Sequence, residues 1–241
     1  MKPCIQPTST DILQRIISLL TFYMIEITSH CPLCLSADTA HFSRDQLRDY
    51  LRCEHCKLVF VPQKFHLSSA DEQAQYDLHE NNPDDSGYRT FLSRLADPLL
   101  ERLPANAQGL DFGCGPGPCL SAMLEEQGHS VALYDLYYAD NRELLTVDAD
   151  YDFITATEVI EHLSQPMDEL RRLWRLLKPG GYLGLMTKLV ADADKFANWH
   201  YKTDPTHISF FSVQTFEYLS QQWDSSAEII GADVIIFRKP L

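Results

Sequence analysis

The sequence has few basic residues and no long apolar run. Only 20 lysines and arginines stand against 34 aspartates and glutamates among 241 residues, which gives a formal net charge of −14. Because nucleic-acid affinity comes largely from neutralising phosphates, this balance argues against a broad nucleic-acid surface and leaves only local basic patches. No stretch approaches the roughly 20 apolar residues of a membrane-spanning helix. The sequence also lacks internal repeats and low-complexity tracts.

The N-terminal segment, residues 1–27, contains a short apolar run that Glu26 interrupts. It has no small-residue cleavage site of the kind that ends a secretion signal. We expect residues 1–27 to form an extension or a helix, with Met24 as an alternative natural start. Unpaired cysteines later in the chain favour a reducing compartment, so a cytoplasmic location is expected.

The most informative pattern lies in residues 109–135. A short apolar strand is predicted directly before a turn with Gly113, Gly115 and Gly117, and an amphipathic helix and a second strand ending on Asp135 follow. The glycines let the chain turn sharply and bring backbone N–H groups close to a ligand at the helix N-terminus. An acid at the end of the second strand can accept both hydroxyls of a ribose. This context predicts a nucleoside-cofactor site.

Residues 110–117 (LDFGCGPG) resemble the first motif of the class I S-adenosylmethionine (SAM)-dependent methyltransferases. Prolines at positions 116 and 118 fit poorly with the alternative, a dinucleotide fingerprint. Three later segments resemble further motifs of the family in its order, namely residues 151–156, 158–163 and 176–183. The resemblance covers roughly residues 88–239. It implies an α/β fold, a Rossmann-like seven-stranded sheet, over a methyltransferase domain at 104–241.

The resemblance also implies a set of SAM-binding residues. They are Asp111, Gly113, Gly115, Gly117, Asp135, Asp148 and Thr157. Only fifteen residues separate Asp135 from Tyr151, so the usual second helix and third strand are abbreviated there or the sheet is reorganised. In the first case residues 143–147 would form a vestigial strand. Asp148 is the candidate adenine contact, and the alternative is an acid in a turn.

Four cysteines form two closely spaced pairs, Cys31 with Cys34 and Cys53 with Cys56. Two such pairs supply a tetrahedral soft-ligand set that suits structural zinc. Rubredoxin-like iron and two disulfides are the alternatives, and His30 and His55 are possible substitute ligands. We expect a zinc ribbon over residues 28–66. It resembles small zinc modules that precede methyltransferase domains acting on sugars, antibiotics and RNA.

Residues 67–103 are expected to form a linker and lid helices. The first part, residues 68–87, is polar and acidic, whereas 88–103 has apolar residues at helical spacing, with Pro98 kinking or splitting the helix. Tyr76 and Tyr88 are candidate lid residues, with simple packing as the alternative. Residues 227–238 carry two apolar runs that predict a closing antiparallel pair of strands.

A third set of residues points to chemistry. Glu158, Glu161 and His162 would share one face of a helix after the fourth strand, where ligands collect in such sheets. With the later His207 they resemble ubiquinone-biosynthesis O-methyltransferases and small-RNA 3′-terminal 2′-O-methyltransferases. In the RNA group the matching four residues hold magnesium, so the resemblance implies a possible magnesium site here. Without a metal, His162 or His207 could act as general base. Alternatively, the acid and the imidazole only satisfy backbone groups or contact the cofactor.

These patterns together predict a SAM-dependent methyltransferase that acts on an oxygen of a small-molecule acceptor. The dense aromatic segment with Trp199 and Tyr201 would either stack on a flat substrate or form part of a lid core. One alternative is methylation of RNA or protein, with the ribbon as docking module. The other is a non-catalytic SAM-binding interaction protein.

Overall fold

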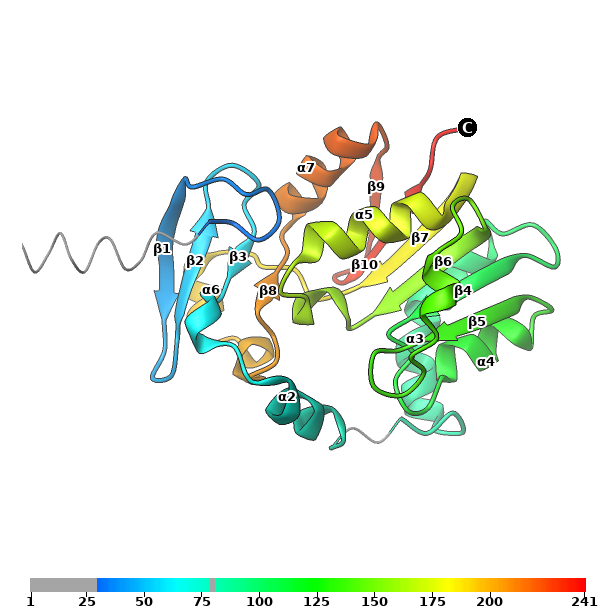
Figure 1. The fold of residues 1–241 in the computed structure, drawn as a ribbon, viewed down its shortest axis with the longest axis horizontal. Coiled ribbons are helices and arrows are strands. Elements are labelled where there is room, and N and C mark those ends of the chain that lie inside the picture. The colour runs from blue at the N-terminus through cyan, green and yellow to red at the C-terminus, as the bar shows by residue number, and fades with distance from the viewer. Residues whose placement is uncertain (1–29, 79–80) are drawn as a thin grey trace, which may run out of the picture.

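A mostly parallel sheet lies at the centre of the computed structural model, which describes residues 30–78 and 81–241 (Figure 1). Its order is β5-β4-β6-β7-β10-β9. The strands are β4 (Gln108–Phe112), β5 (Ser130–Tyr134), β6 (Tyr151–Thr157), β7 (Leu177–Met186), β9 (Ala227–Ile230) and β10 (Val234–Arg238). Strands β4 to β7 are parallel, and β10 runs antiparallel to both β7 and β9. The predicted closing strand pair is therefore present, whereas the segment 1–27 lies outside the described residues.

Helices cover both faces of this sheet. The helices α3 (Ser86–Leu100) and α4 (Cys119–Glu125) share a buried cluster with Phe153 and Met186. On the other face, α5 (Pro166–Leu176) and α7 (Val213–Trp223) share a cluster with Ile154 and Leu185. Neighbouring strand residues thus face opposite layers, as the twofold period of a strand requires. Helix α3 continues as one element with Pro98 in its last turn.

The seven-stranded prediction is wrong for the described chain, because the sheet has six strands. Residues 143–147 do not form a strand, and η2 (Arg142–Leu145) is a 3₁₀ helix with Leu145 buried. The short segment between β5 and β6 has no room for both a helix and a strand. It uses a tight bridge between Asp135 and Ala139 instead, which leaves β5 at the edge of the sheet.

A second, smaller sheet combines two distant parts of the chain. Strands β1 (Thr39–Arg44), β2 (Asp49–Cys53) and β3 (Val59–Phe60) form an antiparallel set, and β8 (Ser209–Phe210) pairs with β3. The pairing continues where the Val61 N–H donates to the Ile208 carbonyl at 2.9 Å. In Figure 1, β8 therefore lies between the cysteine-bearing hairpins and the central sheet.

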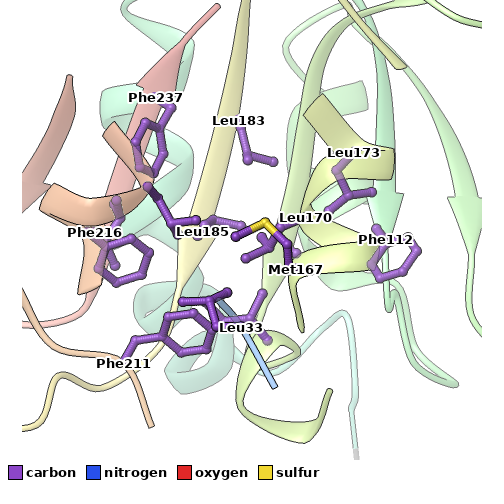
Figure 2. Packing of buried hydrophobic residues seen from close by; sticks show 14 of the residues in the cluster. Leu33, Phe112, Met167, Leu170, Leu173, Leu183, Leu185, Phe211, Phe216 and Phe237 are labelled. Atoms are coloured by element: carbon purple, nitrogen blue, oxygen red, sulfur yellow. The ribbon is translucent and has the colours of Figure 1, made fainter. Parts of the chain in front are cut away.

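The two sheets share one hydrophobic core. Leu33 of the first cysteine pair is 1% exposed and lies in the same buried cluster as Met167, Leu170 and Phe211. Figure 2 shows Leu33 at the base of this cluster, below the α5 residues. Because the cluster also contains all the fully buried cysteines of the ribbon, the N-terminal module is an integral part of the fold.

The acidic segment 68–87 contains a helix, α2 (Ser69–Tyr76), which the Ser68 side chain caps by accepting from the Asp71 N–H. Two hydroxyls from the turn after β5 hold this segment. Tyr137 donates to Glu72 at 2.9 Å and Tyr138 donates to Asp77 at 2.7 Å. The remaining helices are α6 (Ala193–Ala197) and the 3₁₀ turns η1 (Gln63–Phe65), η3 (Ile160–His162) and η4 (His200–Thr203).

Candidate functional site

A cavity of about 1200 Å³ opens at the carboxyl ends of β4, β5 and β6. Its wall includes the glycine turn after β4, helix α2 and the segment from His200 to His207. Ligands of open α/β sheets bind at this edge. Because cavities for a single small ligand measure about 300–1,000 Å³, this one has room for a nucleoside cofactor and a second molecule beside it.

The glycine turn depends on its missing side chains. Gly113 and Gly115 have φ angles of +77° and +64°, in the region that favours glycine. A Cβ at Gly113 would lie 2.4 Å from the Val159 side chain. Both residues line the cavity, whereas Gly117 is buried away from the cavity wall. A Cβ at Gly117 would lie 1.7 Å from the Asn81 carbonyl oxygen. The missing side chain of Gly117 therefore makes room for the backbone at Asn81 rather than for a ligand.

Asp135 lies at the cavity wall, where its carboxylate ties the glycine turn to the next turn. One oxygen accepts from the Gly115 N–H at 3.0 Å, and the other accepts from the N–H groups of Tyr137 and Tyr138 at 2.9 and 3.1 Å. A carboxylate offers about four acceptor positions. About one position therefore remains for a ribose hydroxyl, and the fit to a nucleoside rests on a single bond to Asp135.

Asp111 is 2% exposed and acts as an anchor. Its oxygens accept from the hydroxyls of Ser121 and Thr155, both at 2.7 Å, which fastens β4 to α4 and β6. Burial raises the pKa of Asp111 despite these bonds. Thr157, at the end of β6, lines the cavity, and its contact with SAM stays a prediction.

The assignment of Asp148 is corrected by the structure. This residue is exposed, precedes the amino end of β6 and pairs with Arg175 at 3.1 Å. The cavity opens at the opposite, carboxyl end of the same strand. Asp148 is therefore an acid in a turn rather than an adenine contact.

The three residues after β6 do not share a helical face. Glu158 has a φ angle of +52°, and only Ile160–His162 forms a 3₁₀ turn. This geometry brings possible ligand atoms of Glu161, His162 and His207 within 4.8 Å of one another, in a group that does not include Glu158. Left-handed non-glycine residues are costly and concentrate at functional sites. The predicted four-ligand set thus becomes a three-residue group with Glu158 beside it.

Two carboxyl groups lie at this position, that of Glu161 fully buried and that of Glu158 half-buried. Glu161 is fully buried and accepts from the Tyr201 hydroxyl through Oε1. Its Oε2 and the Oε1 of Glu158 have no hydrogen-bond partner among the described residues. Burial raises the pKa of Glu161 to about 8, with the nearby Glu158 adding to the shift, and burial raises that of Glu158 to about 7. Buried polar atoms of this kind call for a proton, a water or a cation.

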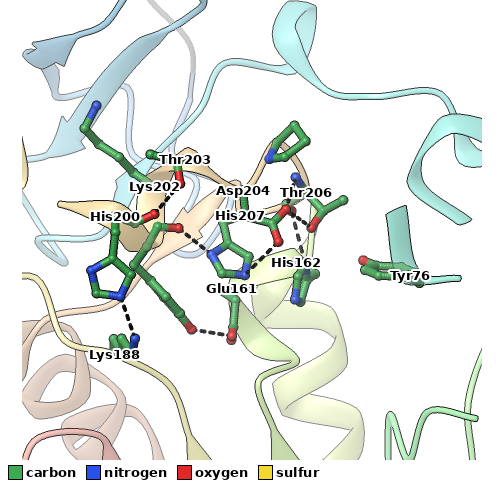
Figure 3. Close-up of polar contacts among 12 residues, drawn as sticks. Tyr76, Glu161, His162, Lys188, His200, Lys202, Thr203, Asp204, Thr206 and His207 are labelled. Carbon is green, nitrogen blue, oxygen red and sulfur yellow. Dashed lines mark hydrogen bonds and ion pairs between the residues drawn. The ribbon is translucent and has the colours of Figure 1, made fainter. Parts of the chain in front are cut away.

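The two histidines approach each other edge to face, with ring centroids 4.6 Å apart (Figure 3). Nδ1 of His207 lies 2.6 Å from the Tyr201 carbonyl oxygen, and Nδ1 of His162 lies 3.3 Å from that of Thr206. A carbonyl only accepts, so Nδ1 donates in both rings and the neutral ring keeps its lone pair on Nε2. Such backbone bonds orient imidazoles that act as bases or metal ligands.

Aromatic groups surround these histidines, and in the sequence they are candidates for a lid or for substrate contact. The Tyr76 ring of α2 lies 5.2 Å from the His162 ring, and its hydroxyl donates to Glu72 at 3.0 Å. Tyr201 is 5% exposed and lines the cavity, and Trp199 packs with the same aromatic cluster as Phe196. Tyr88 also lines the cavity from α3.

The four cysteines of the ribbon converge. The Sγ atoms of Cys31 and Cys56 lie 3.4 Å apart, as do those of Cys34 and Cys53, and all four form one group. A tetrahedral ion with bonds of about 2.3 Å would place sulfurs at roughly this spacing. His30 and His55 are exposed and do not belong to the group.

Both cysteine pairs have the same backbone turn. The Leu35 N–H donates to the Cys31 carbonyl at 2.9 Å, and the Lys57 N–H donates to that of Cys53 at 3.0 Å. Leu35 and Lys57 both have a φ angle of +61°. This repetition supports a four-cysteine metal site over separate uses of the two pairs.

Comparison with known proteins adds family information. A family model described as a methyltransferase domain matches residues 85–224, more than half of the chain, and does not reach the cysteine group. The malonyl-[acyl-carrier protein] O-methyltransferase of Enterobacter lignolyticus is 32% identical over 119 residues, which are 42% of this chain and 47% of that protein. The ubiquinone biosynthesis O-methyltransferase of Nitrosospira multiformis is 30% identical over 132 residues, which are 46% of this chain and 51% of that protein. The chain thus spans about half the length of these relatives.

Solved structures show weaker likenesses. The 1,6-didemethyltoxoflavin-N1-methyltransferase of Burkholderia thailandensis, with bound S-adenosylhomocysteine, is 17% identical and has a TM-score of 0.49. The match covers 77% of this chain and 96% of that chain. A putative SAM-dependent methyltransferase of Methanococcus maripaludis is 18% identical with a TM-score of 0.46, covering 75% and 96%. Likenesses at this level do not decide a substrate. In the described part of the chain, no helix is long and apolar enough to cross a membrane.

Proposed function

The chain belongs to the methyltransferase domain family, in the class I SAM-dependent group, and from this premise we propose that it methylates an oxygen of a small-molecule acceptor. One observation carries the proposal. A single cavity is lined both by the glycine turn with Asp135 and by His162 and His207. A cofactor and an acceptor bound together there would meet in front of the histidines.

The glycine turn and Asp135 fit the nucleoside part of SAM. The turn supplies close backbone approach at Gly113 and Gly115, and the carboxylate of Asp135 retains an acceptor position for a ribose hydroxyl. When bound, SAM supplies an electrophilic methyl group on a sulfonium. The contribution of the chain is to hold the acceptor oxygen in line with that methyl and to exclude water, since orientation supplies much of the rate of such transfers.

Proton removal is assigned to the histidine pair. In this proposal His207 takes the acceptor hydroxyl proton at Nε2, because its Nδ1 is held by the Tyr201 carbonyl. His162 is the second candidate, with Nδ1 held by the Thr206 carbonyl. A positioned general base of this kind contributes about 10²–10⁴-fold.

A divalent cation such as magnesium could replace or assist the base. Glu161, His162 and His207 would offer one oxygen and two nitrogen ligands, and the partnerless Oε2 of Glu161 is the oxygen such an ion would satisfy. A bound cation lowers the pKa of a coordinated hydroxyl. Glu158 lies outside the compact group and would join only after a rearrangement.

The acceptor class rests on two observations. The relatives are named as O-methyltransferases, one of malonyl-[acyl-carrier protein] and one of ubiquinone biosynthesis. The net charge of −14 disfavours a polyanionic acceptor such as RNA. The docking role of the ribbon in the RNA or protein alternative also finds little support, because β3 is already paired with β8 and Leu33 is buried in the shared core.

For the ribbon we propose one structural zinc ion held by Cys31, Cys34, Cys53 and Cys56. Four converging thiols, with no fifth candidate ligand among the described residues, leave no open position for chemistry. The ion would fix the two hairpin turns whose apolar residues enter the shared core.

The test is to incubate the protein with methyl-labelled SAM and separate pools of phenols, catechols, carboxylic acids and RNA, with and without a chelator. We expect label in a hydroxyl or carboxyl pool. For a hydroxyl acceptor the label should be lost in His207→Gln, with Asp140→Asn as an exposed control outside the residues that line the cavity. Transfer that survives strong chelation would rule out the cation. Label in RNA alone, or no transfer from any pool, would contradict the proposed function.

A further inference from the structure

The turn between β1 and β2 carries a buried arginine. Arg48 is 6% exposed, and a buried charge must find partners because water no longer solvates it. Within the ribbon, its Nε donates to the Tyr50 hydroxyl at 2.9 Å, and that hydroxyl donates to Asp45 at 2.6 Å. The other oxygen of Asp45 accepts from the Leu47 and Arg48 N–H groups, at 2.8 and 2.9 Å. The guanidinium is thus fixed from one side by its own hairpin.

The other side of the guanidinium reaches the active-site wall. Nη2 donates to the carbonyls of Lys202 and Asp204, both at 2.7 Å, and Nη1 donates to that of Pro205 at 2.9 Å. These carbonyls lie about 150 residues further along the chain. The Lys202 ammonium adds an ion pair to Asp45 at 3.1 Å. A planar guanidinium with several donors suits such a cluster, whereas lysine presents only a point charge.

The same loop orients both histidines. Its carbonyls at Tyr201 and Thr206 accept from Nδ1 of His207 and His162. Arg48 binds three of the four carbonyls between them, those of Lys202, Asp204 and Pro205. Directly after His207, the Ile208 carbonyl accepts from the Val61 N–H of the ribbon, and the Ile208 N–H donates to the Glu161 carbonyl at 2.9 Å. The ribbon therefore hydrogen-bonds to the loop before His207, through Arg48, and directly after it, through the Val61 N–H.

We propose that Arg48 is a positioning residue of the active site, which fixes the loop at residues 201–206 and thereby the tautomer and orientation of His162 and His207. The ribbon then serves to hold the loop at residues 201–206 in place, rather than to dock a partner. This inference rests on the proposed function only for the statement that the histidines meet the acceptor. Its geometric part concerns the free protein.

The experiment compares Arg48→Lys with Arg44→Lys, an exposed arginine of the same hairpin that pairs with Asp49. Nitrogen-15 spectra of the histidine rings, in metal-free buffer at one pH, report which ring nitrogen carries the proton. His162→Gln and His207→Gln assign the two signals among the nine histidines. We expect both rings as the Nδ1–H tautomer in the wild type and in Arg44→Lys. In Arg48→Lys, we expect both signals to lose this single-tautomer pattern.

Tyr50→Phe provides a second test if Arg48→Lys fails to fold. It removes the hydroxyl between Arg48 and Asp45 and keeps the ring packed 5.0 Å from Phe196. The same two histidine signals should shift in the same direction by a smaller amount. Unchanged signals in every folded variant, or equal changes in Arg44→Lys, would overturn the proposal.

Binding of S-adenosylhomocysteine separates this inference from the proposed function. Its affinity should change by less than about twofold in Arg48→Lys, because the guanidinium hydrogen bonds go to Tyr50 and to the loop carbonyls rather than to the glycine turn. Turnover, once an acceptor is found, should fall at least about tenfold, since displaced catalytic groups lose rate steeply. A wild type that neither binds nor transfers would defeat the proposed function, whereas the histidine spectra would still decide the role of Arg48.

Discussion

Replacing Leu33 with alanine tests whether the ribbon and the central sheet share one core. Leu33 is 1% exposed and belongs to the cluster of Met167, Leu170 and Phe211. Truncating a leucine in a closed core costs about 2–5 kcal/mol, because transfer free energy is lost and a cavity remains. For a chain of this length each kcal/mol lowers Tm by roughly 2–4 °C, so a cost of about 3 kcal/mol predicts a fall of roughly 6–12 °C.

The assay is thermal unfolding followed by tryptophan fluorescence. Trp174 and Trp223 are stacked 4.5 Å apart on α5 and α7, outside the ribbon. In a Trp199→Phe background, which removes the third tryptophan beside the small sheet, their transition reports on the central sheet and its helices. Leu35→Ala is the control, because Leu35 belongs to the same cysteine turn but is 68% exposed. Its Tm should stay near that of the wild type.

Hydrogen exchange then locates the effect. In Leu33→Ala, amides of α5 and β7 should lose protection together with those of β1 to β3. An unchanged tryptophan transition, with faster exchange confined to β1 to β3, would refute the single core and make the ribbon a separate unit.

Three further predictions concern the metal, the buried acids and the glycine turn. The purified chain should contain one zinc per molecule, and Cys53→Ser should lose it while Cys114→Ser, outside the cysteine group, retains it; metal analysis decides. With chelator present, the free energy of unfolding should fall as pH rises from about 4.5 to about 8, because Glu158 and Glu161 keep their protons in the folded state after the unfolded chain has lost them. Urea titrations should show a shallower fall in Glu161→Gln than in the wild type or the exposed control Glu143→Gln, and equal slopes would contradict the raised pKa. Gly113→Ala should be less stable to urea than Gly128→Ala, since both have positive φ but only a Cβ at Gly113 meets a side chain.

Local patterns in the sequence predicted the cofactor end of the site. The strand, glycine turn and Asp135 lie within 27 consecutive residues, and the α/β methyltransferase fold follows from four such segments in order. The convergence of two cysteine pairs was predictable for the same reason, because each pair is a local turn with its own ligand spacing.

The missed features depend on backbone geometry or on distant contacts. The left-handed φ of Glu158 breaks the expected helical face, and a glutamate, unlike a glycine, does not mark such a conformation in advance. For the segment 136–150 the sequence allowed an abbreviated helix and strand or a reorganised sheet. The prediction that Asp148 contacts adenine was wrong, because this residue lies in an exposed turn at the opposite end of β6 from the cavity. The contact between Arg48 and the carbonyl of Pro205 spans 157 residues, beyond the reach of any periodicity.

A calorimetric titration with S-adenosylhomocysteine tests the central claim most directly. The account predicts one saturable site of micromolar affinity in the wild type and in Asp140→Ala, whose side chain is 43% exposed. Asp135→Ala should bind at least about tenfold more weakly, or about 1.4 kcal/mol, because it loses a ribose bond and the ties to the glycine turn. No saturable heat from the wild type, or equal affinity in Asp135→Ala, would contradict the account.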